Sequence, residues 1–249
     1  MNASSRQLGQ LSLLDEHLAP RHAWRVRPSP RARRLAVRVL PGGLVEIVVP
    51  HGTRPRTIEQ FVSRHRRWIE RKLALYQPLE TAPADGLPSR IHFAASGQEY
   101  EVECVETRAG PRLDVGGGFI RLRGDRTRPA FLRHVLQRFT MREAHTTLSP
   151  WLAGLAAANE LRYERLQIRR QRTRWGSCSR SGTISLNACL LFQPPPVVNY
   201  LLIHELAHTR HMNHSRRFWR LVERLEPRWR ELDRALSSGW RAVPSWALD

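Results

Sequence analysis

Two histidines and a glutamate stand together in residues 204–208, which read HELAH. An α-helix turns by about 100° per residue, so His204 and His208 lie about 40° apart on one face, one turn from each other. Two imidazoles placed in this way can bind one zinc ion. Glu205 lies beside that face, where it can serve as general base toward a zinc-bound water. The spacing therefore predicts a zinc site with His204 and His208 as ligands and Glu205 as the catalytic residue.

A pair of histidines one turn apart also occurs on ordinary amphipathic helices that hold no metal. Here the seven preceding residues, 197–203, read VVNYLLI and are mostly apolar, which indicates a buried helix. Two histidines and a glutamate in a buried helix need partners or a metal to offset their lost hydration. The apolar context therefore favours the metal site.

The third zinc ligand must come from outside the motif, because a catalytic zinc ion usually takes three protein ligands and keeps one position open. His214 is the favoured candidate, and His211 is its rival. Three ligands along one straight helix would span about 10 Å at 1.5 Å per residue, which is too far for one ion. His214 requires the chain to turn near Met212 and Asn213, and asparagine tolerates the left-handed conformation that ends many helices. We therefore predict that His214 completes the site.

The N-terminal half of the chain shows mainly strand patterns. Residues 33–50 carry two alternating apolar runs on either side of a Pro-Gly-Gly turn, which predicts a hairpin. Residues 57–76 show helical spacing, with Thr57 as the N-cap. Residues 91–124 contain four short strand candidates separated by turns, after a stretch at 77–90 that has the composition of a linker.

The C-terminal half combines helices with a short sheet. One helix opens after Pro129, and Ser149 with Pro150 predicts the start of a separate helix that has proline at its first position. Strand patterns follow at 165–171 and 182–191. The motif helix comes next, and one more helix extends up to Pro227. This order of elements predicts an α+β fold in which the motif helix packs on a short sheet.

The predicted organisation has four segments. Residues 1–22 form a loose leader, and residues 23–125 form an N-terminal β-rich section with one helix. Residues 126–236 form the domain that carries the motif, and residues 237–249 form a C-terminal tail.

Composition limits the compartment and the partners. The chain of 249 residues has a formal net charge of +19, with 41 basic residues spread along its length, and this charge favours polyanions such as nucleic acid. The three cysteines form no CxxC pair, which fits a reducing compartment. The N-terminus lacks the pattern of a signal peptide, and no apolar run is long enough to span a bilayer. We therefore expect a cytoplasmic protein that makes no membrane contact.

Several segments together resemble the YgjP-like metallopeptidase family, whose motif is related to that of SprT-like and WLM-type proteases. The resemblance rests on RWGSC at 174–178, ISLN at 184–187, the stretch VNYLLIHELAH and NHSRRFW at 213–219. It extends to the N-terminal hairpin and the helix that follows, so it covers roughly residues 24–236.

The resemblance implies a zincin-like fold around the motif helix. It implies Zn²⁺ held by His204, His208 and His214, with Glu205 as base, and hydrolysis of peptide bonds in a protein or peptide substrate. The spacing of the three histidines equals that of metzincins, but His211 stands where those enzymes have glycine, so we do not place the chain among them.

The role of Arg174 in the RWGSC segment is not determined by its chemistry. Its guanidinium is suited to contact the substrate or to stabilise the oxyanion of a tetrahedral intermediate. The alternative is that Arg174 and Trp175 brace the edge of the sheet beside the motif helix.

Three functions from different classes follow. The leading one is a zinc metallopeptidase, a hydrolase of the HExxH type that uses a zinc-bound water. The second is a DNA-associated protease in the manner of SprT-like proteins, motivated by the charge of +19. The third is a non-hydrolytic zinc-binding adaptor, which an intact Glu205 disfavours because a structural site needs no base. The sequence predicts no oligomeric state.

Overall fold

The computed structural model describes residues 24–40, 43–74 and 86–248. The predicted leader and most of the predicted linker therefore lie outside the described residues. The chain divides into two units, Met1–Pro78 and Leu79–Asp249. No described helix combines the length and the apolar character that crossing a membrane requires.

The first unit is a three-stranded sheet covered by one helix. The strands are β1 (Trp24–Ser29), β2 (Ala36–Val39) and β3 (Val45–Pro50), in the order β1-β3-β2. β2 pairs with β3 in antiparallel register, which confirms the predicted hairpin, and β1 runs parallel to β3.

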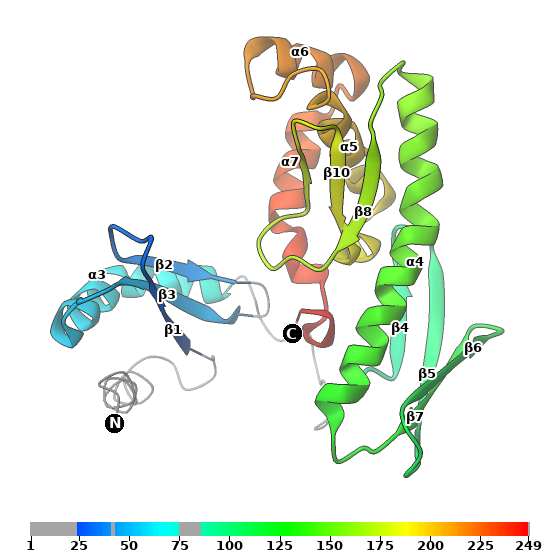
Figure 1. Cartoon of the computed structure of the whole chain (residues 1–249), viewed down its shortest axis with the longest axis horizontal. Coiled ribbons are helices and arrows are strands. Elements are labelled where there is room, and N and C mark those ends of the chain that lie inside the picture. The colour runs from blue at the N-terminus through cyan, green and yellow to red at the C-terminus, as the bar shows by residue number, and fades with distance from the viewer. Residues whose placement is uncertain (1–23, 41–42, 75–85, 249) are drawn as a thin grey trace. The chain divides into compact units, whose positions relative to one another are not determined.

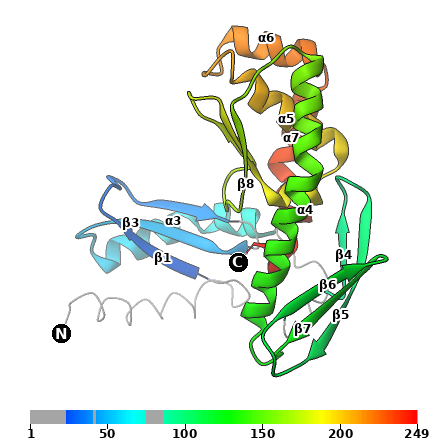
Figure 2. The same ribbon diagram turned by 45° about the vertical axis from the view of Figure 1, so that its right-hand side comes forward.

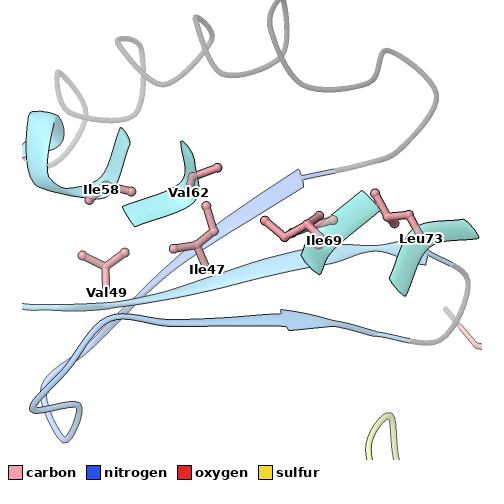
Figure 3. Close-up of a cluster of buried hydrophobic side chains, with 7 residues drawn as sticks. Ile47, Val49, Ile58, Val62, Ile69 and Leu73 are labelled. Carbon is pink, nitrogen blue, oxygen red and sulfur yellow. The ribbon is translucent and has the colours of Figure 1, made fainter. Parts of the chain in front are cut away.

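Helix α3 (Pro55–Leu73) packs its apolar side chains on one face of that sheet (Figure 3). The buried cluster consists of Val45, Ile47, Val49, Ile58, Val62, Ile69 and Leu73. The helix begins at Pro55 after an Arg54 N-cap, so the prediction of Thr57 as N-cap was wrong. Proline is well suited to the first turn because the N–H that it lacks has no intrahelical partner there.

The second unit begins with a four-stranded sheet. Its strands are β4 (Arg90–Phe93), β5 (Gln98–Glu106), β6 (Arg112–Gly116) and β7 (Phe119–Gly124), in the order β4-β5-β7-β6. The sequence analysis grouped this region with the N-terminal section, but these strands pair among themselves, and Phe93 and Tyr100 pack on Phe139 of helix α4. The division between the units therefore falls before this sheet. The assignment of catalytic function to 126–236 stays a prediction.

Helix α4 (Pro129–Ala158) runs along the second unit, with the four-stranded sheet beside its N-terminal half and the motif region beside its C-terminal half (Figures 1 and 2). It is one continuous helix with Pro150 inside it, so the prediction of a separate helix starting at Ser149 was wrong. Leu148, Leu152 and Ala156 are buried on either side of the proline. Burial of this face across Pro150 favours continuation of the helix over a break.

A second, three-stranded sheet lies next to the motif helix. It contains β8 (Arg165–Arg169), β9 (Gly176–Cys178) and β10 (Thr183–Asn187), with β10 in the centre, parallel to β8 and antiparallel to β9. The predicted strand at 182–191 is shorter than expected, because residues Ala188–Phe192 form a 3₁₀ helix, η4. The Asn187 side chain begins that turn by accepting a hydrogen bond from the Cys189 N–H at 3.0 Å.

Three α-helices and two short 3₁₀ helices complete the unit. They are α5 (Pro195–Ala207), which carries the motif, α6 (Arg216–Leu225), α7 (Trp229–Ser238), η5 (Gly239–Ala242) and η6 (Ser245–Ala247). Trp240 and Trp246 are buried in the predicted tail. Trp240 stacks on Trp175 at 3.9 Å between ring centroids, and the Trp246 carbonyl accepts a hydrogen bond from Gln137 at 2.7 Å. The segment after 236 is thus part of the core of this unit.

The α+β fold class predicted from the order of elements is confirmed. The motif helix α5 packs against strand β9, as expected for the zincin-like arrangement of a helix on a short sheet. This contact brings the RWGSC segment to the motif helix, and it determines much of the geometry of the site.

Candidate metal centre

Helix α5 is buried on almost every side. Its apolar residues before the motif, Val197, Val198, Leu201, Leu202 and Ile203, are all buried. A helix that is apolar all round belongs in the interior of a protein, and the polar groups of the motif are therefore drawn into the core with it. This position desolvates the side chains of the motif.

The motif helix ends earlier than the sequence analysis predicted. Its last residue is Ala207, and His208 caps it in an ordinary right-handed conformation. The turn continues through backbone hydrogen bonds from Thr209 to Leu206 and from His211 to Ala207, both at 3.0 Å. Among the described residues, Glu160 is the one non-glycine residue with positive φ, so Asn213 does not end the helix in a left-handed conformation. The chain instead leaves the helix at His208, and the five residues 209–213 form a loop before His214.

That loop brings His214 to the two helical histidines. Each of His204, His208 and His214 offers one ring nitrogen, and these three atoms lie within 4.8 Å of one another. The Nε2 atoms of His204 and His214 are 3.2 Å apart. A tetrahedral zinc ion with Zn–N bonds near 2.0–2.1 Å holds its nitrogen ligands roughly 3.3–3.4 Å apart. The three histidines therefore fit the donor set of a zinc ion.

His211, the rival ligand, contributes its backbone. The Nδ1 atom of His208 lies 3.1 Å from the His211 carbonyl oxygen, so a proton on Nδ1 donates to that carbonyl and leaves Nε2 with a free lone pair. Such a hydrogen bond fixes the ring orientation and tautomer of a metal-binding histidine. His211 thus orients the His208 ring and is absent from the cluster of converging nitrogens.

His204 is supported on its far side by Tyr200 and Asp233. The Tyr200 hydroxyl donates to the Asp233 carboxylate at 2.8 Å and lies 3.4 Å from Nδ1 of His204. Burial, followed by the hydrogen bond to Asp233, raises the pKa of Tyr200, so the phenol stays protonated. Burial also lowers the pKa of His204 to about 3, with further contributions from His208 and His214. His204 is therefore neutral at pH 7, the state that a metal ligand requires.

Aromatic side chains of α6 stack on the histidines. Phe218 is fully buried and stacks on His208 at 4.4 Å between centroids, and Trp219 stacks on His214 at 5.5 Å. These two side chains therefore hold the imidazole rings in place.

Glu205 is the least compensated polar group of the site. It is 4% exposed, and within the described part of the chain its Oε2 atom has no hydrogen-bond partner. Burial raises the pKa of Glu205 to about 8. An uncompensated buried carboxylate is costly in a folded protein, and groups of this kind concentrate at functional sites.

Gly176 of strand β9 makes the space that Glu205 occupies. A Cβ atom at this position would lie 2.6 Å from Oε1 of Glu205 and 2.9 Å from its Cγ. The glycine of the RWGSC segment is therefore required by close packing against the motif glutamate. This contact was not predicted from the sequence, although the RWGSC segment itself stood out there.

The remaining residues of the RWGSC segment have mainly structural contacts. The Trp175 indole donates to the Leu236 carbonyl at 3.0 Å, which supports the bracing role for Trp175. Arg174 is exposed, and its carbonyl accepts a hydrogen bond from the Asn187 side chain at 2.8 Å. Burial, together with the charge of Glu205, raises the pKa of Cys178 to about 11, which makes it a poor thiolate. Any contact of the Arg174 side chain with a substrate stays a prediction.

Three histidines that converge beside a buried, uncompensated carboxylate form the residue set of a metal-dependent hydrolase. The model of the YgjP-like metallopeptidase domain matches residues 33–239. The chain therefore belongs to the YgjP-like metallopeptidase family, as the resemblance of its motifs predicted.

No curated protein shows a significant match to the chain. Among solved structures, the chain is similar to the metallopeptidase zymogen abylysin from Pyrococcus abyssi. The identity is 31%, the alignment covers 34% of this chain and 89% of that one, and the TM-score is 0.32.

Proposed function

We propose that the protein is a zinc-dependent peptidase in which His204, His208 and His214 bind the metal and Glu205 acts as general base. Membership of a metallopeptidase family supports the reaction class. The observation that carries the finer assignment is the convergence of three ring nitrogens within 4.8 Å next to a glutamate that is 4% exposed. A purely structural site would gain nothing from burying that carboxylate.

A bound zinc ion would supply Lewis-acid polarisation of the peptide carbonyl and lower the pKa of water at the site. Glu205 accepts a proton from the attacking water and delivers it to the departing amine. Its raised pKa, about 8, suits both steps, because a proton shuttle works best with a pKa near the working pH. Tyr200 and the His211 carbonyl hold the ligand rings in position during these steps.

Arg174 remains our candidate for contact with the substrate or transition state. The Asn187 side chain anchors its backbone by donating to the carbonyls of Arg174 and Gln171. The segment leads directly into β9, whose Gly176 touches Glu205. Arg174 lies two positions before the glycine that touches the base, and an exposed guanidinium on such an anchored segment is well suited to an oxyanion.

The adaptor hypothesis predicts a closed site with four protein ligands. The cluster found in the described part of the chain has three members, all histidine. A set of three leaves one position for water or substrate, which supports the hydrolase. The proposals of action at DNA and of a cytoplasmic location stay predictions.

Metal analysis combined with peptide cleavage tests the proposal. The parent protein should bind one zinc ion and cleave an unstructured peptide library, and a chelator should abolish the cleavage. His204→Ala and His214→Ala should lose the metal, whereas His211→Ala should retain it because His211 contributes a backbone carbonyl. Retention of stoichiometric zinc by His214→Ala would refute the ligand assignment, and cleavage that survives chelation would refute the mechanism.

A further inference from the structure

A groove lined by four arginines adjoins the loop that joins the histidines. It has a volume of about 270 Å³ and is lined by Arg210, His211, Arg217, Arg220, Leu221 and Arg224. His211 is the residue whose carbonyl holds His208 at 3.1 Å. One wall of the groove is therefore part of the loop between the second and third histidines of the metal centre.

The positive charge of this groove is not neutralised within the described part of the chain. Arg217, Arg220 and Arg224 are exposed and follow the i, i+3, i+7 spacing that places side chains on one face of α6. None of the four arginines forms an ion pair with a described acidic residue. The acidic residues of this region pair elsewhere: Glu223 with Arg230 at 2.9 Å and Glu226 with Arg228 at 3.8 Å.

Arg210 also lines the groove and is held by a backbone contact. It follows the turn that ends α5, and its guanidinium donates to the Glu160 backbone carbonyl at 2.9 Å. That contact orients the side chain and leaves its charge in place. Four like charges around one groove repel one another, and an anionic occupant relieves this repulsion.

The surroundings favour a peptide as the occupant. Leu221 is buried and lines the groove beside the arginines, so the groove also offers apolar contact, which suits the methylene groups of a glutamate side chain. Guanidinium groups bind carboxylates in a paired, planar geometry. A peptide with its scissile bond at the metal centre would have neighbouring residues within reach of the loop that forms one wall.

We propose that this arginine groove is a substrate subsite that binds acidic side chains flanking the scissile bond, so that the enzyme prefers acidic peptides. This inference rests on the proposed peptidase function and names its substrate class. Two exposed ion pairs contribute roughly 0.4–2 kcal/mol together, so the expected preference for acidic over neutral peptides is about two- to thirtyfold in kcat/KM.

The test compares two peptides that differ only by Glu→Gln substitutions flanking the cleaved bond. The parent should cleave the acidic peptide about two- to thirtyfold more efficiently, and the preference should fall as salt rises. The double variant Arg220→Gln with Arg224→Gln should cleave both peptides with equal kcat/KM. The matched control removes two charges elsewhere, with Arg108→Gln and Arg138→Gln, and should keep the preference.

Peptide binding separates failure of the subsite from failure of the peptidase. The Glu205→Gln variant loaded with zinc should bind a fluorescent acidic peptide more tightly than the neutral one, and substitution of Arg220 and Arg224 in that background should remove the difference. Equal binding of both peptides would overturn the subsite even if cleavage is observed. A DNA oligonucleotide that binds these arginines more tightly than the acidic peptide would overturn it in favour of nucleic acid.

Discussion

Two buried glutamates in this protein have opposite electrostatic surroundings. Glu46 in the first unit and Glu205 in the second are each 4% exposed. Glu46 on β3 lies beside Arg25 and Arg27 of the neighbouring strand β1, with an ion pair to Arg25 and 3.4 Å to Nε of Arg27. Glu205 has no such cation, and its Oε2 atom has no partner in the described structure.

Their pKa values follow from this difference. Burial raises the pKa of Glu46, but the hydrogen bond from Arg25 and the charges of both arginines outweigh burial, so its pKa lies below the ordinary value. For Glu205 burial acts alone and raises the pKa to about 8. The two side chains are equally exposed, yet the pKa of Glu46 lies below the ordinary value and that of Glu205 lies well above it. The comparison teaches that neighbouring cations offset the effect of burial on the pKa of a carboxyl group, and that this effect is uncompensated where such cations are absent.

The largest expected difference between the two glutamates is in catalysis. Glu205→Gln should lower kcat by about 10³-fold, because a general base contributes roughly 10²–10⁴ to the rate, and it should retain zinc. Glu46→Gln should leave kcat within about twofold, because Glu46 lies in the other unit and outside the metal centre. Steady-state kinetics with metal analysis checks both variants. A Glu205→Gln enzyme with the parental kcat would show that the two glutamates do not differ in catalysis.

The two groups should also give stability opposite dependences on pH in the metal-free protein. The pKa of Glu205 is about 8 when folded, against an ordinary 4.5, so the unfolded chain releases this proton first as pH rises. Stability conferred by the protonated carboxyl is present below pH 4.5 and is lost between about pH 4.5 and 8, by an amount on the order of 3–5 kcal/mol. Glu46 acts in the other direction, because its lowered pKa adds stability above about 4.5 that is lost as pH falls.

Denaturant unfolding from pH 5 to 9 of the parent and of Glu205→Gln, both without metal, checks this prediction. The difference in unfolding free energy between the two proteins reports Glu205 alone, because both contain the same histidines. His204, whose pKa is lowered to about 3, makes the stability of both proteins rise with pH below about 6.5. The parent should lose stability relative to the variant as pH rises. A difference that does not change with pH would show that Glu205 is not held protonated by its surroundings.

Gly176 offers a way to disturb Glu205 without altering its chemistry. Gly176→Ala places a methyl group 2.6 Å from Oε1 of Glu205, so the carboxylate must move. Because a displacement of about 1 Å can cost about 10²-fold in rate, kcat should fall by about ten- to a hundredfold while zinc is retained. Gly154→Ala is the control, since a Cβ there meets nothing within 4 Å. Equal activity of the two variants would mean that the position of Glu205 is not critical.

The smallest effect concerns the stability of the first unit. Glu46→Gln removes the carboxylate that Arg25 and Arg27 share, and both arginines are about half exposed, with 44% of each side chain accessible. Solvent screening therefore limits the loss of unfolding free energy at pH 7 to about 1–2 kcal/mol. Glu59→Gln on the exposed side of α3 should have almost no effect, and urea denaturation of both variants measures the difference. An unchanged midpoint for Glu46→Gln would show that the ion pairs contribute nothing.

Local patterns were sufficient for most individual elements. The hairpin of residues 36–50, the four strands β4 to β7 and the motif helix were predicted because the two-residue and 3.6-residue apolar periods are properties of short segments. The errors lie where tertiary contacts override a local signal. Pro150 indicated a helix start, yet α4 continues through it because Leu148 and Leu152 are buried on either side. Residues 237–249 were predicted as a C-terminal tail, yet Trp240 and Trp246 lie in the core.

The sequence by itself determined that His204 and His208 share a helix face and that His214 follows at a distance suited to a turn. The tertiary structure decided what surrounds them. Gly176 and Glu205 are 29 positions apart in the printed sequence, and Tyr200 and Asp233 are 33 apart. Such contacts depend on how strand β9 and helix α7 pack on α5, and no local period encodes that packing. The sequence therefore contains the candidate ligands. The burial of Glu205 away from any cation, by contrast, arises only when the chain folds, and this burial raises its pKa.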